Sequence, residues 1–237
     1  MDLLKNGAEF FGLRVLNEQA AMFEQYKDLL IQWNKKFNLT AITDENDIII
    51  RHFLDSLSVA LAMDDNKKGA SLIDIGSGAG FPGLPLKIML DELDVILMDS
   101  VGKKVSFLQE VINILGLKNV TAINSRAEDL AKLPDYREKF DFATARAVSR
   151  LSVIAEYCLP FVKIGGKFIS MKLSDAKEEI NEAKAAISAL GGEISEVITV
   201  EIPFSDITHS LIVIDKTSHA PLKYPRKAGK ASKSPIK

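Results

Sequence analysis

The sequence has one cysteine, Cys158, among its 237 residues, and its three histidines lie far apart. One thiol cannot form an internal disulfide, and histidines without ligand spacing give no zinc motif, so no metal site is expected. No apolar run approaches the roughly 18 residues of a membrane-spanning helix. Asp2 and Glu9 interrupt the first apolar pattern, which therefore does not resemble a secretory signal. We expect a cytoplasmic protein without a membrane segment.

Aromatic residues are also scarce, at 7% of the chain, but 47% of all residues are apolar and 26% are charged. This composition is typical of a soluble globular protein, and the apolar fraction excludes a chain that is disordered throughout. The length predicts one large domain, or one domain with a small appendage. Nothing in the sequence indicates a protein partner, so we expect a monomer.

The formal net charge of −2 conceals a strong asymmetry along the chain. From Lys216 to Lys237 there are seven lysine or arginine residues and no acidic residue, which leaves a charge of −9 on residues 1–215. An acidic body with a basic end is compatible with a polyanionic partner such as RNA. Residues 217–237 contain few large apolar side chains and many Lys, Pro, Ser and Gly, which predicts an extended, mobile tail.

From Ala70 onward, short apolar runs alternate with amphipathic segments. This alternation predicts βαβ units and a parallel sheet covered on both faces. Two final strands follow each other through the short link 203–206, which indicates an antiparallel return. The predicted strands are 71–75, 95–98, 120–123, 140–144, 167–171, 194–200 and 210–214, and the predicted helices between them are 82–90, 103–115, 127–133, 151–162 and 175–190.

Two helical patterns precede this region. Residues 16–37 repeat apolar side chains at steps of three and four, with Asn17 as the predicted N-cap, and residues 46–63 show a second apolar face. We therefore predict a helical cap at 1–68, a main domain at 69–216 and the basic tail, in one compact unit. Five parallel strands and a terminal antiparallel pair make an α/β, Rossmann-like outline, that of the seven-stranded sheet of class I methyltransferases, which use S-adenosylmethionine (SAM).

The strongest local signal is the stretch 74–83, which reads Asp-Ile-Gly-Ser-Gly-Ala-Gly-Phe-Pro-Gly and joins the first strand to a helix. Glycines permit a sharp turn and a close approach of a nucleotide to the main chain, at the strand end where doubly wound sheets bind ligands. Gly78, Gly80 and Gly83 formally satisfy the dinucleotide fingerprint, so an NAD-binding oxidoreductase is one alternative. Asp74 before the first glycine is instead typical of SAM enzymes, and Pro82 has no N–H to offer a pyrophosphate.

Two further segments are placed to contact a nucleotide cofactor. Asp99 ends the second strand, where its carboxylate can accept hydrogen bonds from both ribose hydroxyls of NAD or SAM. Residues 124–129 follow the third strand and flank the expected adenine position, with Ala127 and Glu128 nearest. These placements agree with either cofactor.

The chain lacks motifs that two kinds of methyl transfer need. No Asn/Asp-Pro-Pro-aromatic element for an exocyclic adenine amine follows the fourth strand at 143–148. Carbon-5 methylation of a pyrimidine requires a thiolate, but Cys158 lies in an apolar helical stretch and is predicted to be a core residue. A ring nitrogen such as guanine N7 has an in-plane lone pair and needs no base, which suits this sequence.

Several motifs together closely resemble one family. They are Asn-Leu-Thr-Ala-Ile at 38–42, His-Phe-Leu-Asp-Ser-Leu at 52–57, the glycine stretch at 74–83, Asp-Ser-Val-Gly-Lys-Lys at 99–104 and Tyr-Pro-Arg-Lys at 224–227. The family is the bacterial 16S rRNA guanine-N7 methyltransferase G family, also called glucose-inhibited division protein B. The resemblance implies a class I fold, SAM as cofactor, 16S rRNA or the small ribosomal subunit as partner, and methylation of the 530-loop guanine conventionally numbered 527.

The resemblance also implies site residues. Arg146 and Lys172 are candidates for a part in catalysis, although the chain has Ala-Arg-Ala-Val at 145–148 and Met-Lys-Leu at 171–173 where the family commonly has Ser-Arg-Ala-Phe and Met-Lys-Gly. A methyltransferase for another RNA or a small molecule, and a non-catalytic RNA-binding module, are further alternatives. The implied SAM contacts are Gly76, Gly78, Phe81, Asp99, Ala127, Glu128 and Arg146.

The predicted RNA contacts are basic side chains at the ligand edge of the sheet and in the tail. Tyr224 adds an aromatic platform next to two cations on a stiff Tyr-Pro backbone, which suits RNA. Arg51 and His52 precede an apolar helical face, and the pair could close the site from the cap. The full predicted set is Arg51, Lys103, Lys104, Lys172, Tyr224, Arg226 and Lys227.

Overall fold

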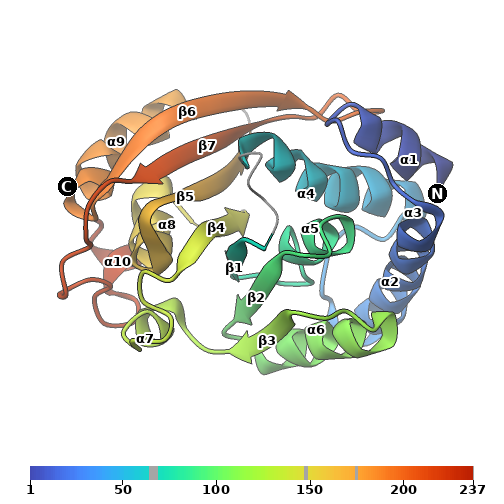
Figure 1. The fold of residues 1–237 in the computed structure, drawn as a ribbon, viewed down its shortest axis with the longest axis horizontal. Coiled ribbons are helices and arrows are strands. Elements are labelled where there is room, and N and C mark those ends of the chain that lie inside the picture. Colours follow the sequence, from blue (N-terminus) through green and yellow to red (C-terminus); the bar gives the residue numbers. More distant parts are fainter. Residues whose placement is uncertain (64–68, 147–148, 174–175, 237) are drawn as a thin grey trace.

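The computed structural model describes residues 1–63, 69–146, 149–173 and 176–236, which fold around a seven-stranded sheet (Figure 1). Its strand order is β3-β2-β1-β4-β5-β7-β6, with β1 to β5 parallel and β7 antiparallel to both of its neighbours. The predicted class I α/β architecture is thus confirmed. The strands are β1 (Ser71–Ile75), β2 (Asp94–Asp99), β3 (Val120–Asn124), β4 (Phe140–Arg146), β5 (Val162–Leu173), β6 (Gly192–Glu201) and β7 (Thr208–Lys216).

Helices cover both faces of this sheet (Figure 1). One face carries α5 (Gly83–Met89) and α6 (Gly102–Leu115), with the N-terminal helices packed outside them. The other face carries α7 (Ala127–Leu130), α8 (Leu151–Cys158) with the 3₁₀ turn η3 (Leu159–Phe161), α9 (Lys177–Ala189) and α10 (Lys230–Lys233). The start predicted for the last long helix, Asp175, lies outside the described residues. No helix in the described ranges is long and apolar enough to cross a membrane.

The N-terminal cap contains more elements than its periodicity predicts. They are α1 (Asp2–Glu9), α2 (Asn17–Phe37), α3 (Glu45–Ile48), the π-helical η1 (Ile49–Leu54), α4 (Asp55–Leu57) and the 3₁₀ η2 (Ser58–Ala62). The pattern at 46–63 thus follows one helical path of changing type. Ser56 and Ser58 hydroxyls donate to the carbonyls of His52 and Asp55 at 2.5 and 2.6 Å, and such bonds compete with regular helix bonding. Wider π turns occur frequently at functional sites.

The predicted N-cap of α2 is wrong by one residue. Asn17 is already the first helical residue, and Leu16 precedes it in an extended conformation. The Gln19 side chain accepts the backbone N–H of Leu16 at 2.9 Å, which is the glutamine half of a capping box. The Asn17 side chain instead accepts a hydrogen bond from Lys5 at 2.8 Å.

Aromatic side chains join the cap to the glycine-rich turn. The Tyr26 ring stacks on Phe53 and Phe81, with centroids 5.3 and 5.6 Å apart, and its hydroxyl donates to the carbonyl of Ala79 at 2.5 Å. Burial raises the pKa of Tyr26 well above its ordinary value, so the hydroxyl stays protonated and can donate. Cap and sheet residues belong to one buried hydrophobic cluster, which fixes the turn against the cap.

The basic tail is not extended, and that prediction is wrong. Arg137 donates to the carbonyls of Ala220 and Tyr224 at 2.7 and 2.9 Å. Arg226 donates to both oxygens of Glu156, a carboxylate that is 1% exposed. The tail is poor in apolar groups, but its composition does not show that Arg226 has a partner in the folded domain. The buried carboxylate of Glu156 on α8 needs a cation, and Arg226 supplies it.

Candidate functional site

The glycine-rich turn after β1 leaves room for a ligand. Gly76 and Gly78 have φ angles of 73° and 63°, which glycine adopts without steric cost. The amides of Gly76 and Ser77 donate to the carbonyl of Met98 on β2, at 2.8 and 3.0 Å. A Cβ atom on Gly78 would meet only the Gly76 carbonyl, at 3.9 Å, so the space above this residue is open.

The buried side chain of Asp74 holds this turn in place by hydrogen bonds. Its fully buried carboxyl group accepts the N–H of Gly83 at 3.1 Å and the hydroxyl of Thr144 at 3.2 Å. Burial raises the pKa of Asp74 to about 6 in spite of these donors. A Cβ on Gly83 would lie 2.3 Å from Leu97, so only glycine lets α5 approach the sheet this closely. Asp74 thus holds the turn rather than facing a ligand.

Asp99 lies beside the open space above Gly78, as predicted for a ribose-binding carboxylate. One of its oxygens accepts the N–H of Gly78 at 3.0 Å, and the other accepts the N–H of Val101 at 2.8 Å. The Asp99 side chain is buried, and the Lys104 ammonium lies 3.6 Å from its Oδ2. An open glycine turn next to an oriented carboxylate suits a nucleoside with free ribose hydroxyls, so these residues fit SAM.

The other predicted cofactor contacts lie on both sides of this turn. Ala127 and Glu128 open α7 and are buried, and Glu128 accepts the N–H of Gly229 from the tail at 3.2 Å. The Phe81 ring is buried against the His52 ring, 4.3 Å between centroids, and the Arg146 guanidinium lies 4.8 Å from its centroid. The Phe81 side chain therefore faces the cap in this structure.

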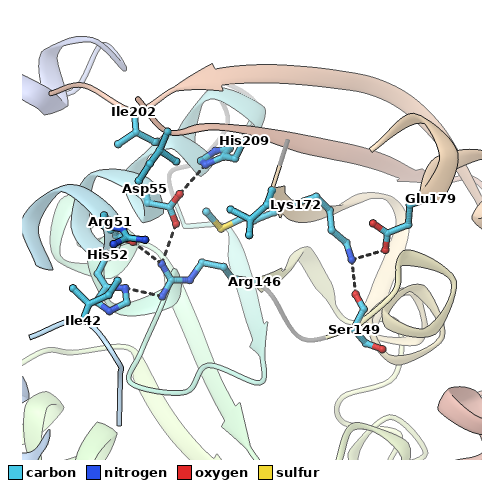
Figure 2. Close-up of a pocket in the computed structure, with 13 residues that line it drawn as sticks. Ile42, Arg51, His52, Asp55, Arg146, Ser149, Lys172, Glu179, Ile202 and His209 are labelled. Atoms are coloured by element: carbon cyan, nitrogen blue, oxygen red, sulfur yellow. Dashed lines mark hydrogen bonds and ion pairs between the residues drawn. The ribbon is translucent and has the colours of Figure 1, made fainter. Parts of the chain in front are cut away.

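A cavity of about 630 Å³ opens at the carboxyl ends of β4 and β5 (Figure 2). The cap, β4, β5, β7, the link before β7 and α9 each contribute side chains. The lining residues are Ile42, Arg51, His52, Asp55, Arg146, Ser149, Met171, Lys172, Leu173, Glu179, Ile202, Ile207 and His209. The cavity thus brings together Arg51, Arg146 and Lys172 from the predicted set.

Arg146 is held in this cavity by groups from the cap. Its guanidinium donates to Asp55 Oδ2 at 2.9 Å, to the Arg51 carbonyl at 3.2 Å and to His52 Nδ1 at 3.1 Å (Figure 2). The other oxygen of Asp55 pairs with His209 Nδ1 at 2.7 Å. Burial alone would raise the pKa of Asp55, but the His209 hydrogen bond and the Arg146 charge lower it below its ordinary value.

His52 is neutral in this arrangement. Burial and then the Arg146 charge lower the pKa of His52 to about 3. Because its Nδ1 accepts from Arg146, its Nε2 carries the proton and donates to Thr40 Oγ1 at 2.7 Å. His52 therefore orients Arg146 and keeps no free lone pair for proton abstraction.

Lys172 lies on the other side of the cavity. Its ammonium donates to the Ser149 carbonyl and to Glu179 Oε1, the latter at 2.7 Å. The same Glu179 oxygen accepts the N–H of Leu151, the first residue of α8, at 2.5 Å. The pair therefore fixes the start of α8 while its side chains face the cavity (Figure 2).

The other predicted RNA contacts divide into two groups. Lys103 lies over the Phe37 ring, 5.1 Å from its centroid, and Arg51 pairs with Asp47 at 3.6 Å. With Lys104, they lie near the cofactor turn and the cavity. Tyr224, Arg226 and Lys227 lie in the tail on the α8 face, where Lys227 is exposed and Arg226 is committed to Glu156.

Among the cavity residues that sequence reasoning missed are three titratable groups that make its ion pairs: Asp55, His209 and Glu179. Asp55 belongs to the His-Phe-Leu-Asp-Ser-Leu motif, so that motif carried a usable signal. His209 and Glu179 reach the cavity only through the antiparallel pairing of β7 and the docking of α9. Of the two positions at 145–148 where the chain departs from the family pattern, Ala145 is buried at the end of β4, and Val148 lies outside the described residues.

No metal or thiolate chemistry is supported by the described residues. They contain no group of three His, Cys, Asp or Glu side chains that could hold a metal ion. Cys158 is fully buried, and burial raises the pKa of its thiol well above its ordinary value, so it is not a nucleophile.

Sequence comparison points to one family. The family described as rRNA small subunit methyltransferase G, GidB, matches residues 19–208 of this chain. A ribosomal RNA small subunit methyltransferase G of Alkaliphilus oremlandii is 50% identical and covers 100% of this chain and 98% of its own length. The protein of the same name from Acetivibrio thermocellus is also 50% identical, covering 99% of this chain and 96% of its own.

Comparison of structures shows the same fold at low identity. A SAM-dependent methyltransferase from Aquifex aeolicus superposes with a TM-score of 0.54 and 21% identity, over 78% of this chain and 97% of its own. TYW2 of M. jannaschii, crystallised in complex with AdoMet, gives a TM-score of 0.52 and 16% identity, over 64% and 70% of the two chains. At these identities the likeness concerns the fold alone.

Proposed function

The chain belongs to the rRNA small subunit methyltransferase G family, GidB, and from this premise we propose that its acceptor is N7 of guanine 527 in the 530 loop of 16S rRNA. Membership makes it a SAM-dependent rRNA methyltransferase. The observation that carries the N7 assignment is the cavity between cap and sheet, in which the two cap groups beside Arg146 that could remove a proton, Asp55 and His52, are already engaged. The Asp55 carboxylate accepts hydrogen bonds from Arg146 and His209. The unprotonated nitrogen of His52, Nδ1, accepts one from Arg146.

Guanine N7 suits such a cavity because it needs no deprotonation. Its in-plane lone pair forms the new bond to carbon while the carbon–sulfur bond of the sulfonium breaks, so the positive charge moves from sulfur to the base. No proton is transferred in this step. Asp55 and Glu179 place carboxylates on the wall of the cavity where the product base is cationic.

The cofactor residues are proposed from the turn and its surroundings. SAM supplies an electrophilic methyl group when bound. We propose that Gly76 and Gly78 admit the nucleoside, that Asp99 accepts its ribose hydroxyls, and that Ala127 and Glu128 flank its adenine. Arg146, at the end of β4 between turn and cavity, would orient the reacting groups, and Phe81 supports its guanidinium. Holding two reactants in line supplies much of the rate in a displacement of this kind.

The proposed partner is the small ribosomal subunit, or the 16S rRNA within it. Arg51, Lys103 and Lys104 lie on the side of the sheet where the RNA strand would enter the cavity, and Lys172 lies inside it. Their contacts to phosphate would position the strand without reading its sequence. Lys227 and Tyr224 offer a second contact on the tail.

The test is transfer of labelled methyl from SAM to small subunits that lack N7-methylguanine, with the modified base mapped by N7-specific strand cleavage. We expect one modified guanine in the 530 loop. Incorporation at another position would replace the proposed acceptor, and an absence of incorporation with intact SAM binding would refute this substrate.

A further inference from the structure

The ion pair between Lys172 and Glu179 has hydrogen-bonding capacity left over. An ammonium has three N–H donors, and two of those on Lys172 reach Ser149 and Glu179. On Glu179, Oε1 accepts both Lys172 and the N–H of Leu151, whereas Oε2 has no hydrogen-bond partner among the described residues. The pair therefore presents one donor and one carboxylate oxygen side by side on the cavity wall (Figure 2).

The strand register sets this pair across the cavity from Arg146. Arg146 on β4 lies opposite Met171 on β5, so Lys172 points to the other face of the sheet because side chains alternate. Arg146 consequently contacts the cap, and Lys172 contacts Ser149, just before α8, and Glu179 on α9. Across the cavity the order is Arg146, Lys172, Glu179 (Figure 2).

We infer that Lys172 and Glu179 select guanine by binding its Watson–Crick edge, an inference that rests on the proposed function. Around a guanine the order of groups is N7, O6, N1–H and N2–H₂. With Lys172 donating to O6 and Glu179 Oε2 accepting from N1–H and N2–H₂, N7 is turned toward β4 and Arg146. The pair thus serves both recognition and orientation of the acceptor atom.

The same pair rejects adenine. Adenine carries an amino donor in place of O6 and a lone pair in place of N1–H, so it would set donor against ammonium and acceptor against carboxylate. A site whose polar groups are left unpaired by the wrong ligand discriminates strongly. Hypoxanthine keeps O6 and N1–H but lacks the 2-amino group, so it tests the Glu179 contact alone.

A purely bracing role of Glu179 can be separated from this one. In Glu179→Gln, the amide oxygen can still accept from Lys172 and Leu151, which preserves the brace. The amide nitrogen then occupies the position of Oε2 and opposes the donors of guanine. Glu178 is the preceding residue on α9 and is exposed, so Glu178→Gln removes the same charge nearby as a matched control.

The experiment compares kcat/KM on small subunits reconstituted with either guanine or inosine at the target position. For the wild type and Glu178→Gln we expect at least a tenfold preference for guanine, about what one charge-assisted hydrogen bond provides. For Glu179→Gln we expect a guanine rate at least tenfold lower and a guanine-to-inosine ratio close to one. Glu179→Asp, which keeps the carboxylate, should restore part of the preference.

Binding of S-adenosylhomocysteine to each variant reports whether the fold is intact. The inference would be overturned if Glu179→Gln kept the guanine-to-inosine ratio of the wild type, or if the wild type showed no preference for guanine. In both cases methylation of guanine N7 itself would continue. Failure of the wild type to methylate the subunit at all would instead refute the proposed function. If Glu179→Gln does not fold, the guanine-to-inosine ratio of Glu179→Asp is the deciding measurement. Because the aspartate side chain is shorter, a ratio equal to that of the wild type would count against a directed contact from Oε2.

Discussion

Asp55 of the cap and Arg146 at the end of β4, ninety-one positions apart in the sequence, form an ion pair 2.9 Å long. His209 from β7 pairs with the other oxygen of Asp55, and the Arg146 guanidinium lies over the Phe81 ring, 4.8 Å from its centroid. One carboxylate thus connects three separate parts of the chain at the cavity. The cap is therefore part of the site.

This relationship predicts that Arg146→Lys lowers activity without unfolding the protein. A lysine keeps the charge but cannot donate in the plane of the guanidinium to Asp55, His52 and the Arg51 carbonyl together. We expect kcat/KM on small subunits to fall by at least tenfold, a loss of about 1.4 kcal/mol of transition-state stabilisation. Arg14→Lys, at an exposed position remote from the cavity, is the matched control. Equal rates for both variants would mean that Arg146 contributes only charge.

A second prediction concerns the open space above Gly78. Gly78→Asp would place a carboxylate in that space, next to Asp99, and SAM binding measured by calorimetry should be lost. The positive φ itself costs an ordinary residue about 1 kcal/mol. Gly116→Asp has nearly the same φ, 62°, with nothing near its Cβ, and so controls for backbone strain. Normal SAM affinity in Gly78→Asp would remove the cofactor from this turn.

The buried histidine predicts a dependence of stability on pH. The pKa of His52 is about 3 in the folded protein and 6.5 when unperturbed, so the unfolded chain binds the extra proton below pH 6.5. The wild type should lose stability as the pH falls, by about 2 kcal/mol from this group between pH 6.5 and 5. His52→Gln keeps an acceptor for Arg146 and a donor for Thr40 but does not titrate. Urea unfolding at several pH values should show a shallower slope for this variant, and parallel slopes would contradict a neutral His52.

The tail predicts different effects for two neighbouring cations. Arg226→Ala leaves the buried Glu156 without its partner and should lower the free energy of unfolding by about 3 kcal/mol. Lys227→Ala, at an exposed position, should leave stability unchanged but reduce the salt dependence of RNA binding. Adding Glu156→Gln to Arg226→Ala should recover most of the lost stability. If it does not, the ion pair is not the source of the loss.

The glycine-rich turn and the Asp99 carboxylate beside it could be predicted from the sequence because their determinants are local. A strand, three closely spaced glycines and a following helix lie within one short stretch, and Asp99 ends the next strand. Positive φ at Gly76 and Gly78 and the oriented Asp99 carboxylate follow from that local order. Alternating apolar runs gave the parallel strands for the same reason, since period and spacing are visible along the chain.

Most contacts within the cavity were beyond sequence reasoning because they join residues distant along the chain. Nothing local to Glu179 or His209 indicates that α9 and β7 bring them to the cavity that contains Arg146. Arg226 lies in a segment whose composition is typical of a solvated tail, yet its partner is a buried carboxylate on α8. The sequence alone determined the order of elements, the glycine turn and the residue types for a nucleotide. The tertiary structure decided which charges meet, because burial makes each of them require a partner, and only packing determines which partner lies within reach.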